Sequence, residues 1–78
     1  MVITVKLYGT LRRFSRKGTP GIWKGDVPSG STVLELAAQL GAPEDELAAA
    51  AINGETLPLD TVIPENATVM LVTHVNGG

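Results

Sequence analysis

The sequence contains no cysteine and only one histidine, His74, among its 78 residues. Without cysteine the chain can form neither a disulfide nor a thiolate site for a metal ion or an iron–sulfur cluster. A single histidine cannot build a histidine-rich metal site or serve as the base of a cysteine–histidine pair. A hydrolase or a metalloenzyme is therefore not expected, and the sequence predicts no metal site.

Long apolar segments and a strong excess of one charge are also missing. No apolar run approaches the roughly 18 residues of a membrane span, and the first residues lack a signal-peptide pattern. The net charge is only −2, which argues against a dedicated nucleic-acid binder. The length suits one small domain, and we expect it to be cytoplasmic, with neither a membrane nor a nucleic acid as its partner.

The charges are few, and they are unevenly distributed along the chain. All six Lys and Arg residues lie between Lys6 and Lys24, whereas all eight Asp and Glu residues lie from Asp26 onward. Four of the basic residues cluster between Arg12 and Lys17. A solvated loop is the favoured interpretation of this cluster, and a binding patch for phosphate or for an acidic partner is the alternative.

Alternating apolar residues predict strands near both ends of the chain, over 2–8 and 67–75. The positions expected to face the core are Ile3, Val5, Leu7, Val69 and Leu71. The opposite face of the last strand would carry Met70, Val72 and His74. If the two strands lie side by side in the centre of a sheet, their apolar positions form one continuous layer.

The best-specified element is a helix that begins after Thr32. Thr32 and Glu35 have the three-residue spacing of a capping box, in which each side chain accepts from the other residue's backbone N–H. Gly41 suits a left-handed C-cap, and Pro43 prevents continuation. The apolar positions with the spacing of one buried helical face are Val33, Leu36, Ala37 and Leu40.

The remaining segments predict short strands and turns. A second strand is expected over 21–27, and Asn53-Gly54 predicts a tight hairpin between strands at 50–52 and 55–57, although the alanines before it favour helix. Helical turns are expected around Leu11 and Phe14 and at 43–47. The sequence thus predicts the α+β class, with about four to five strands in a mixed sheet packed on one main helix, which is a β-grasp.

The last residues, Val75-Asn76-Gly77-Gly78, are expected to form a flexible tail (75–78) beyond the domain (1–74). Glycine has no Cβ, so such a tail fits a slot too narrow for other residues. Six extended residues from Thr73 to Gly78 span roughly 20 Å, which is enough to place a carboxylate deep in a partner's active site. An ordinary frayed terminus is the alternative.

In this order, the segments resemble the ubiquitin-like sulfur carriers of the MoaD/ThiS superfamily. The resemblance rests on Val5-Lys6-Leu7-Tyr8-Gly9-Thr10-Leu11-Arg12, Gly30-Ser31-Thr32-Val33-Leu34-Glu35-Leu36, Ile52-Asn53-Gly54-Glu55 with Leu59-Asp60-Thr61, and Gly77-Gly78. The long segment between the first two strands, with Leu11-Arg12, is most similar to MoaD, the small subunit of molybdopterin synthase.

The resemblance implies a carrier that has no active site and binds no cofactor itself. An adenylating enzyme of the MoeB/ThiF type would join Gly78 to AMP with Mg and ATP, and a persulfide donor would then convert Gly78 to a thiocarboxylate. The tail Val75, Asn76, Gly77 and Gly78 would then enter the large subunit of molybdopterin synthase (MoaE type) or another sulfur acceptor enzyme. The alternatives are thiamine or other sulfur transfer, attachment to lysines as a ubiquitin-like modifier, and a plain binding module with an incidental tail.

Docking to these partners requires a surface beside the tail. Tyr8, Met70 and Val72 form a candidate apolar patch, and burial of this patch under the 12–21 loop is the equally weighted alternative. His74 is a candidate for tuning docking with pH, although an exposed histidine without a role is the favoured interpretation.

Overall fold

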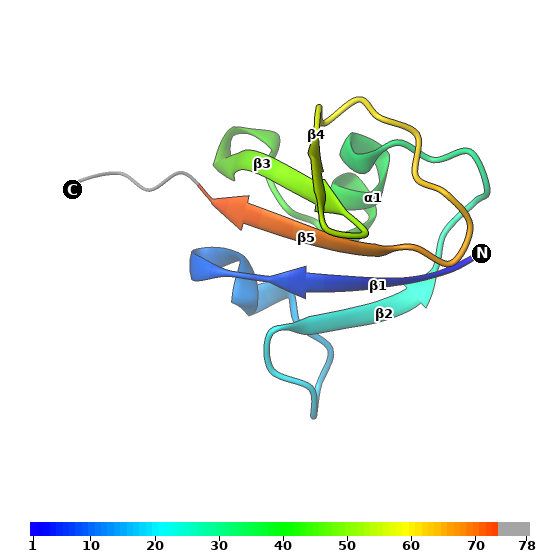
Figure 1. Cartoon of the computed structure of the whole chain (residues 1–78). Helices are drawn as coiled ribbons and strands as arrows, with labels where there is room; N and C mark the ends of the chain where they lie inside the picture. The colour runs from blue at the N-terminus through cyan, green and yellow to red at the C-terminus, as the bar shows by residue number, and fades with distance from the viewer. Residues whose placement is uncertain (74–78) are drawn as a thin grey trace.

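The computed structural model describes residues 1–73, and this part of the chain forms a five-stranded sheet, one α-helix and two short 3-10 helices (Figure 1). In chain order the elements are β1 (Val2–Leu7), η1 (Gly9–Phe14), β2 (Ile22–Asp26), α1 (Val33–Leu40), η2 (Glu44–Glu46), β3 (Leu47–Ile52), β4 (Glu55–Leu57) and β5 (Thr68–Thr73). One helix packed on a mixed sheet is the predicted β-grasp, and the prediction of the fold class is confirmed.

The first and last strands pair in the centre of the sheet. The strand order is β2-β1-β5-β3-β4, in which β1 and β5 run parallel and all other neighbours run antiparallel. The register places Val5 beside Val69 and Leu7 beside Leu71, as the alternation of apolar residues requires. Because β1 and β5 are parallel, the start of β1 lies at the opposite end of the sheet from the end of β5 (Figure 1).

The core lies between the sheet and α1. The fully buried side chains of β1 and β5 meet Val33 and Leu36, which are 0% exposed. The capping box is present: Glu35 N donates to Thr32 Oγ1 at 3.2 Å, and Thr32 N donates to Glu35 Oε1 at 2.8 Å. Gly41 ends the helix in the left-handed conformation with φ 91°. Each fully buried Leu, Ile or Val contributes about 1.5–3 kcal/mol relative to an exposed one, so this layer holds the domain together.

The third strand is longer than the sequence predicts. It was expected over 50–52, but it begins at Leu47 and takes in the alanines that favour helix. Pairing with β5 on one side and β4 on the other satisfies their backbone groups, and this tertiary pairing outweighs helix propensity. The predicted helical turn before it is η2, and the hairpin turn is confirmed, with positive φ at Asn53 (51°) and Gly54 (89°).

The connection between β1 and β2 lies along the outer edge of β2. The backbone N–H of Arg16 donates to Ile22 O at 2.9 Å, and Arg16 Nε donates to Lys24 O at 3.3 Å. The guanidinium also lies 4.8 Å from the ring centroid of Trp23, which is buried. The loop therefore covers an edge of the sheet that would otherwise offer unpaired carbonyls.

Candidate functional site

The predicted tail, residues 75–78, begins two positions after the last described residue. β5 ends at Thr73. The remaining site residues of the sequence prediction are His74, Val75, Asn76, Gly77 and Gly78, and they lie outside the described residues. The boundary between the 1–74 domain and the 75–78 tail therefore stays a prediction, and the described part of the site is the base from which the tail leaves.

Gly9 forms one wall of this base. It begins η1, two residues after the end of β1, with φ 62°, a left-handed conformation that favours glycine. A Cβ on Gly9 would lie 2.6 Å from Thr73 Oγ1, which is closer than real Cβ contacts come. The start of η1 is thus pressed against the end of β5, and the position at which the chain leaves the sheet depends on a glycine here.

The predicted helical turn is η1, and it is anchored by its apolar side chains. Leu11 is 0% exposed, and Phe14 packs against the same core. Arg13 lies over the ring of Phe14, with 4.4 Å from its guanidinium carbon to the ring centroid. Two apolar residues three positions apart therefore fix a turn that carries charged residues on its outer side.

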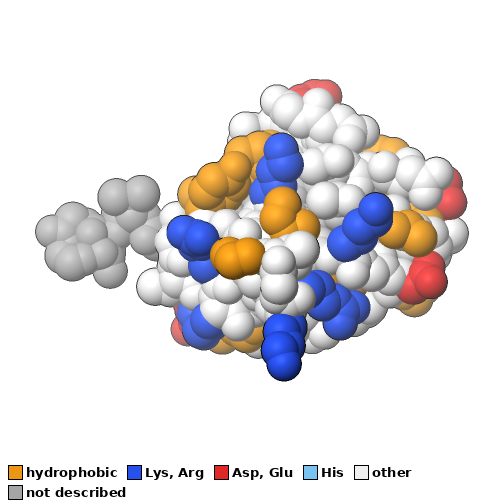
Figure 2. Space-filling model, turned by 90° about the horizontal axis from the view of Figure 1, so that it is seen from below, with side chains coloured by type: hydrophobic (Ala, Val, Ile, Leu, Met, Phe, Trp, Pro, Cys, Tyr) orange, Lys and Arg blue, Asp and Glu red, His pale blue; other side chains and the backbone are white. Residues whose placement is uncertain are grey.

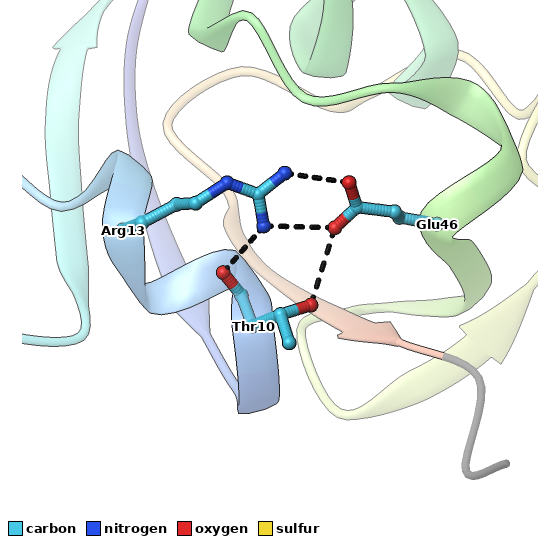
Figure 3. A network of polar contacts seen from close by, with 3 residues as sticks. All are labelled: Thr10, Arg13 and Glu46. Atoms are coloured by element: carbon cyan, nitrogen blue, oxygen red, sulfur yellow. Dashed lines mark hydrogen bonds and ion pairs between the residues drawn. The ribbon is translucent and has the colours of Figure 1, made fainter. Parts of the chain in front are cut away.

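A polar network ties η1 to η2 (Figure 3). Arg13 makes two parallel hydrogen bonds to the carboxylate of Glu46, Nη1 to Oε1 at 2.9 Å and Nη2 to Oε2 at 2.5 Å. Nη1 also donates to Thr10 O at 2.8 Å, and Thr10 Oγ1 donates to Glu46 Oε1 at 3.1 Å. The bonds to Glu46 join residues 33 and 36 positions apart and hold η1 beside the start of β3.

The two ionised groups stabilise each other. The hydrogen bonds from Arg13 hold the pKa of Glu46 below its ordinary value, and the bond to Glu46 raises the pKa of Arg13. Both side chains are partly exposed, so the pair is screened by solvent, and its bidentate geometry makes it more specific than an ordinary surface pair. This contact could not be predicted from the sequence, because no pattern relates the basic cluster to the acids at 44–46.

The structure brings the other predicted docking residues to one side of the sheet. We use the term outer sheet face for the strand residues that point away from α1. Met70 lies there between Lys6 and Ala51, and Val72 lies opposite Ala49. Continuing the parallel register of β1 and β5 places Tyr8, 44% exposed, beside Val72.

The 12–21 loop does not close over this patch. Its backbone bonds attach it to Ile22 on β2, which is separated from β5 by β1. Met70 and Val72 are half-buried within the sheet, flanked by the small side chains of Ala49 and Ala51. Tyr8 is thus exposed, whereas Met70 and Val72 are half-buried, and the role of these three residues in docking stays a prediction.

The sequence analysis missed several residues of the outer sheet face. The register adds Lys6, Ile22, Ala49 and Ala51 to the three predicted positions. Alternation in β1 already put Lys6 on the side of Tyr8, and this signal was available. The alanine run of β3 carries no alternation, so its contribution depends on the observed pairing.

Within residues 1–73, no group of three or more His, Cys, Asp or Glu side chains is placed to hold a metal ion. The same part of the chain has no helix that is both long and apolar enough to cross a membrane. Its only α-helix has eight residues.

Comparison with known proteins gives the family. The sequence model of the ThiS family matches residues 5–78, which is nearly the whole chain. The chain belongs to the ThiS family. Proteins of the ThiS family and their MoaD-like relatives are ubiquitin-like sulfur carriers rather than enzymes, and they work with E1-like adenylating enzymes and sulfur acceptors. The predicted resemblance to the MoaD/ThiS superfamily is confirmed.

A solved structure supports the fold of this ThiS-family chain. The structure of SAMP1 from Haloferax volcanii is similar over 100% of each chain, with a TM-score of 0.68 and 18% sequence identity. At this identity the likeness concerns the backbone arrangement, and it agrees with the ubiquitin-like β-grasp described above.

Proposed function

We propose that this protein carries sulfur as a thiocarboxylate on Gly78 and donates it in molybdopterin biosynthesis, as the small subunit of molybdopterin synthase. The observation that carries the proposal is the family match, which extends through Gly77 and Gly78. The β-grasp supports it, because β5 leads directly from the centre of the sheet to these residues.

The chemistry begins with the Gly78 carboxylate, which is a poor electrophile until it is activated. One carboxylate oxygen attacks the α-phosphate of ATP, held with Mg by the adenylating enzyme, and pyrophosphate leaves. The terminal sulfur of a protein persulfide attacks the acyl carbon, and AMP leaves with the electron pair of the broken C–O bond. A thiolate then attacks the donor's sulfur in the resulting acyl disulfide, which yields the thiocarboxylate and a disulfide.

The protein contributes position rather than catalytic groups to these steps. Its folded part supplies a fixed base, built from Gly9, Thr73 and the Arg13–Glu46 network, from which the last residues reach into the partner. Holding a reacting group at a defined point reduces the entropy lost when the reaction occurs. The acid–base and electrostatic work belongs to the adenylating enzyme and the sulfur acceptor.

The choice of pathway rests on the connection between β1 and β2. In this chain it holds η1, with Leu11 buried and Arg12 exposed, and it continues through the loop to Ile22. An elaborated connection of this kind with Leu11-Arg12 is the feature most similar to MoaD. Thiamine synthesis or another sulfur transfer is the second candidate, because the matching family model is that of ThiS.

The test is intact-protein mass spectrometry after incubation with ATP, Mg, a MoeB/ThiF-type enzyme and a persulfide donor. We expect a mass gain of about 16 Da, from replacement of one oxygen by sulfur at the acyl carbon. Deleting Gly78 should abolish the gain, whereas Lys17→Ala, at an exposed position in the loop, should keep it. Absence of any gain with several such enzymes would contradict sulfur carriage.

Two further readouts separate the pathway and the alternative chemistry. Adding a MoaE-type large subunit and the pterin precursor should return the mass to its original value if the pathway is molybdopterin synthesis. Gly-Gly remnants on lysines of other proteins would show instead that activated Gly78 is attached to protein amines.

A further inference from the structure

The basic residues of the sequence gather on one side of the folded molecule. All six Lys and Arg lie between Lys6 and Lys24, which is the β1–η1–β2 part of the chain. Figure 2 shows them spread over the side of the molecule on which these elements lie, interleaved with apolar side chains, whereas Asp and Glu appear only at its margin. The near-neutral sum of charges therefore hides a basic surface.

Two of the six cations are used within the fold, and four are not. Arg13 pairs with Glu46, and Arg16 covers Trp23 and the edge of β2. The other four are exposed, and within the described part of the chain their side chains form no hydrogen bond or ion pair. These four are Lys6, Arg12, Lys17 and Lys24. The structure thus separates structural cations from available ones, which the sequence cluster alone does not do.

Two of the available cations share a groove. A surface hollow of about 240 Å³, which we call the Lys6–Arg12 groove, lies between the end of β1, η1 and the start of β2. Its walls include Lys6, Tyr8, Arg12, Pro20, Gly21 and Ile22. The side chain of Arg12 lies against the backbone of Gly21: a Cβ built on Gly21 would be 3.6 Å from Arg12 Nε. The groove thus combines two positively charged groups, from Lys6 and Arg12, with the ring of Tyr8 and with aliphatic surface.

This groove continues the outer sheet face towards the base of the tail. Lys6 pairs with Met70 on one side and with Ile22 on the other, so the groove and the apolar strip of β5 are adjacent. Tyr8 belongs to both, and it immediately precedes Gly9, which contacts Thr73. A partner that binds the tail close to its base is therefore next to this groove.

We infer that the Lys6–Arg12 groove binds a carboxylate side chain from an acidic, partly apolar surface of the adenylating enzyme that receives the tail. The inference rests on the proposed function, because that function supplies the partner. A carboxylate accepts from a guanidinium in a bidentate geometry, and an ammonium beside it adds a second charge-assisted bond. Apolar neighbours of that carboxylate would cover Met70 and Val72, which gives the mixed character of a protein interface.

A protein surface fits these features better than a nucleic acid does. Strong nucleic-acid binding requires several phosphate contacts along a backbone, whereas the groove holds two cations at one point. Its remaining walls are apolar, and the chain as a whole is acidic. The acids from Asp26 onward would repel an extended polyanion.

The test compares charge reversals of equal size in the adenylation assay. Lys6→Glu combined with Arg12→Glu should raise the KM for this protein about tenfold at low salt, with little change in kcat, since charge reversal acts on encounter and docking. Lys17→Glu combined with Lys24→Glu is the matched control: it reverses two exposed cations that lie outside the groove and have no side-chain partner within residues 1–73, and it should change KM far less. Raising the salt concentration should shrink the effect of the double variant.

The outcomes separate this inference from the proposed function. If the wild-type chain gains sulfur and the double variant keeps the wild-type KM, the groove inference is wrong and sulfur carriage stands. If the wild-type chain is not modified at all, both the groove inference and the proposed sulfur carriage are wrong. Lys6→Arg with Arg12→Lys retains the charge and should restore most of the lost affinity; failure to do so, with unchanged thermal melting, would show a packing effect. Tight binding of a single-stranded RNA that requires Lys6 and Arg12 would also overturn the inference.

Discussion

Gly9 lies against Thr73 at the end of β5, where the chain leaves the sheet. A Cβ on Gly9 would stand 2.6 Å from Thr73 Oγ1, and the φ of 62° at Gly9 already disfavours other residues. The first residue of η1 and the last residue of β5 are therefore fitted to each other. This contact fixes the base of the tail.

The first prediction concerns this contact. Gly9→Ala should lower the free energy of unfolding by about 2 kcal/mol or more, because a left-handed alanine costs roughly 1–2 kcal/mol and the clash with Thr73 adds to it. Gly18→Ala is the control: it has φ 86°, and nothing lies within 4 Å of its Cβ position. Urea denaturation of both variants measures the difference. Equal losses of unfolding free energy in the two variants would mean that the Thr73 side chain moves away from the new Cβ without destabilising the fold.

The second prediction concerns the Arg13–Glu46 pair and pH. The pKa of Glu46 is lowered in the folded state by its hydrogen bonds from Arg13, so its contribution to stability is present above the pKa of the unfolded state. That contribution is lost as the pH falls through the folded-state pKa. The stability difference between wild type and Glu46→Gln should thus be greatest near pH 7 and should vanish in acid.

Denaturation at a series of pH values measures this difference. Glu44→Gln provides the control, since Glu44 is an exposed acid in the same short helix and makes no ion pair within residues 1–73. A difference between wild type and Glu46→Gln that stays constant down to pH 2 would show that the carboxylate charge is unimportant.

The third prediction concerns the edge of β2. Arg16→Ala removes the bond from Nε to Lys24 O and uncovers Trp23, so the edge can pair with a second copy of the chain. We expect increased self-association in analytical ultracentrifugation at high protein concentration. Lys17→Ala, which removes a neighbouring exposed cation, should leave the protein monomeric to the same extent as wild type. Equal self-association of the two variants would show that the backbone of the loop is enough to protect the edge of β2, without the Arg16 side chain.

The fourth prediction concerns the start of α1. Thr32→Ala removes the side-chain acceptor of the Glu35 N–H and should lower the free energy of unfolding by about 1 kcal/mol. Thr32→Ser keeps the hydroxyl and should recover most of the loss. Chemical denaturation measures both variants. A loss that the serine variant does not recover would assign the role of Thr32 to its methyl group.

The parts of the fold that depend on local rules could be predicted from the sequence. The capping box at Thr32, the left-handed Gly41 and the alternation of β1 each follow from a few adjacent residues, and the structure has all three. Asn53-Gly54 likewise marks its hairpin without any tertiary information.

The parts that depend on distant pairing could not be predicted in this way. The alanines of β3 favour helix on their own, and only the ladders to β4 and β5 make them a strand. The contact between Arg13 and Glu46 and the groove between Lys6 and Arg12 arise from the packing of η1, which brings together charges that the sequence pattern leaves unrelated. The docking residues Met70 and Val72 were predicted from alternation, but their neighbours required the register.

The parallel pairing of β1 with β5 has a mechanical consequence. A force that draws the chain out by its last residues acts along β5, while its neighbour β1 is held by the body of the domain at the opposite end. The backbone bonds between the two strands are then loaded in shear and share the force, whereas the bonds of a hairpin pulled at its open end would break one after another. The domain should therefore resist unfolding by a motor that pulls on its C-terminal end.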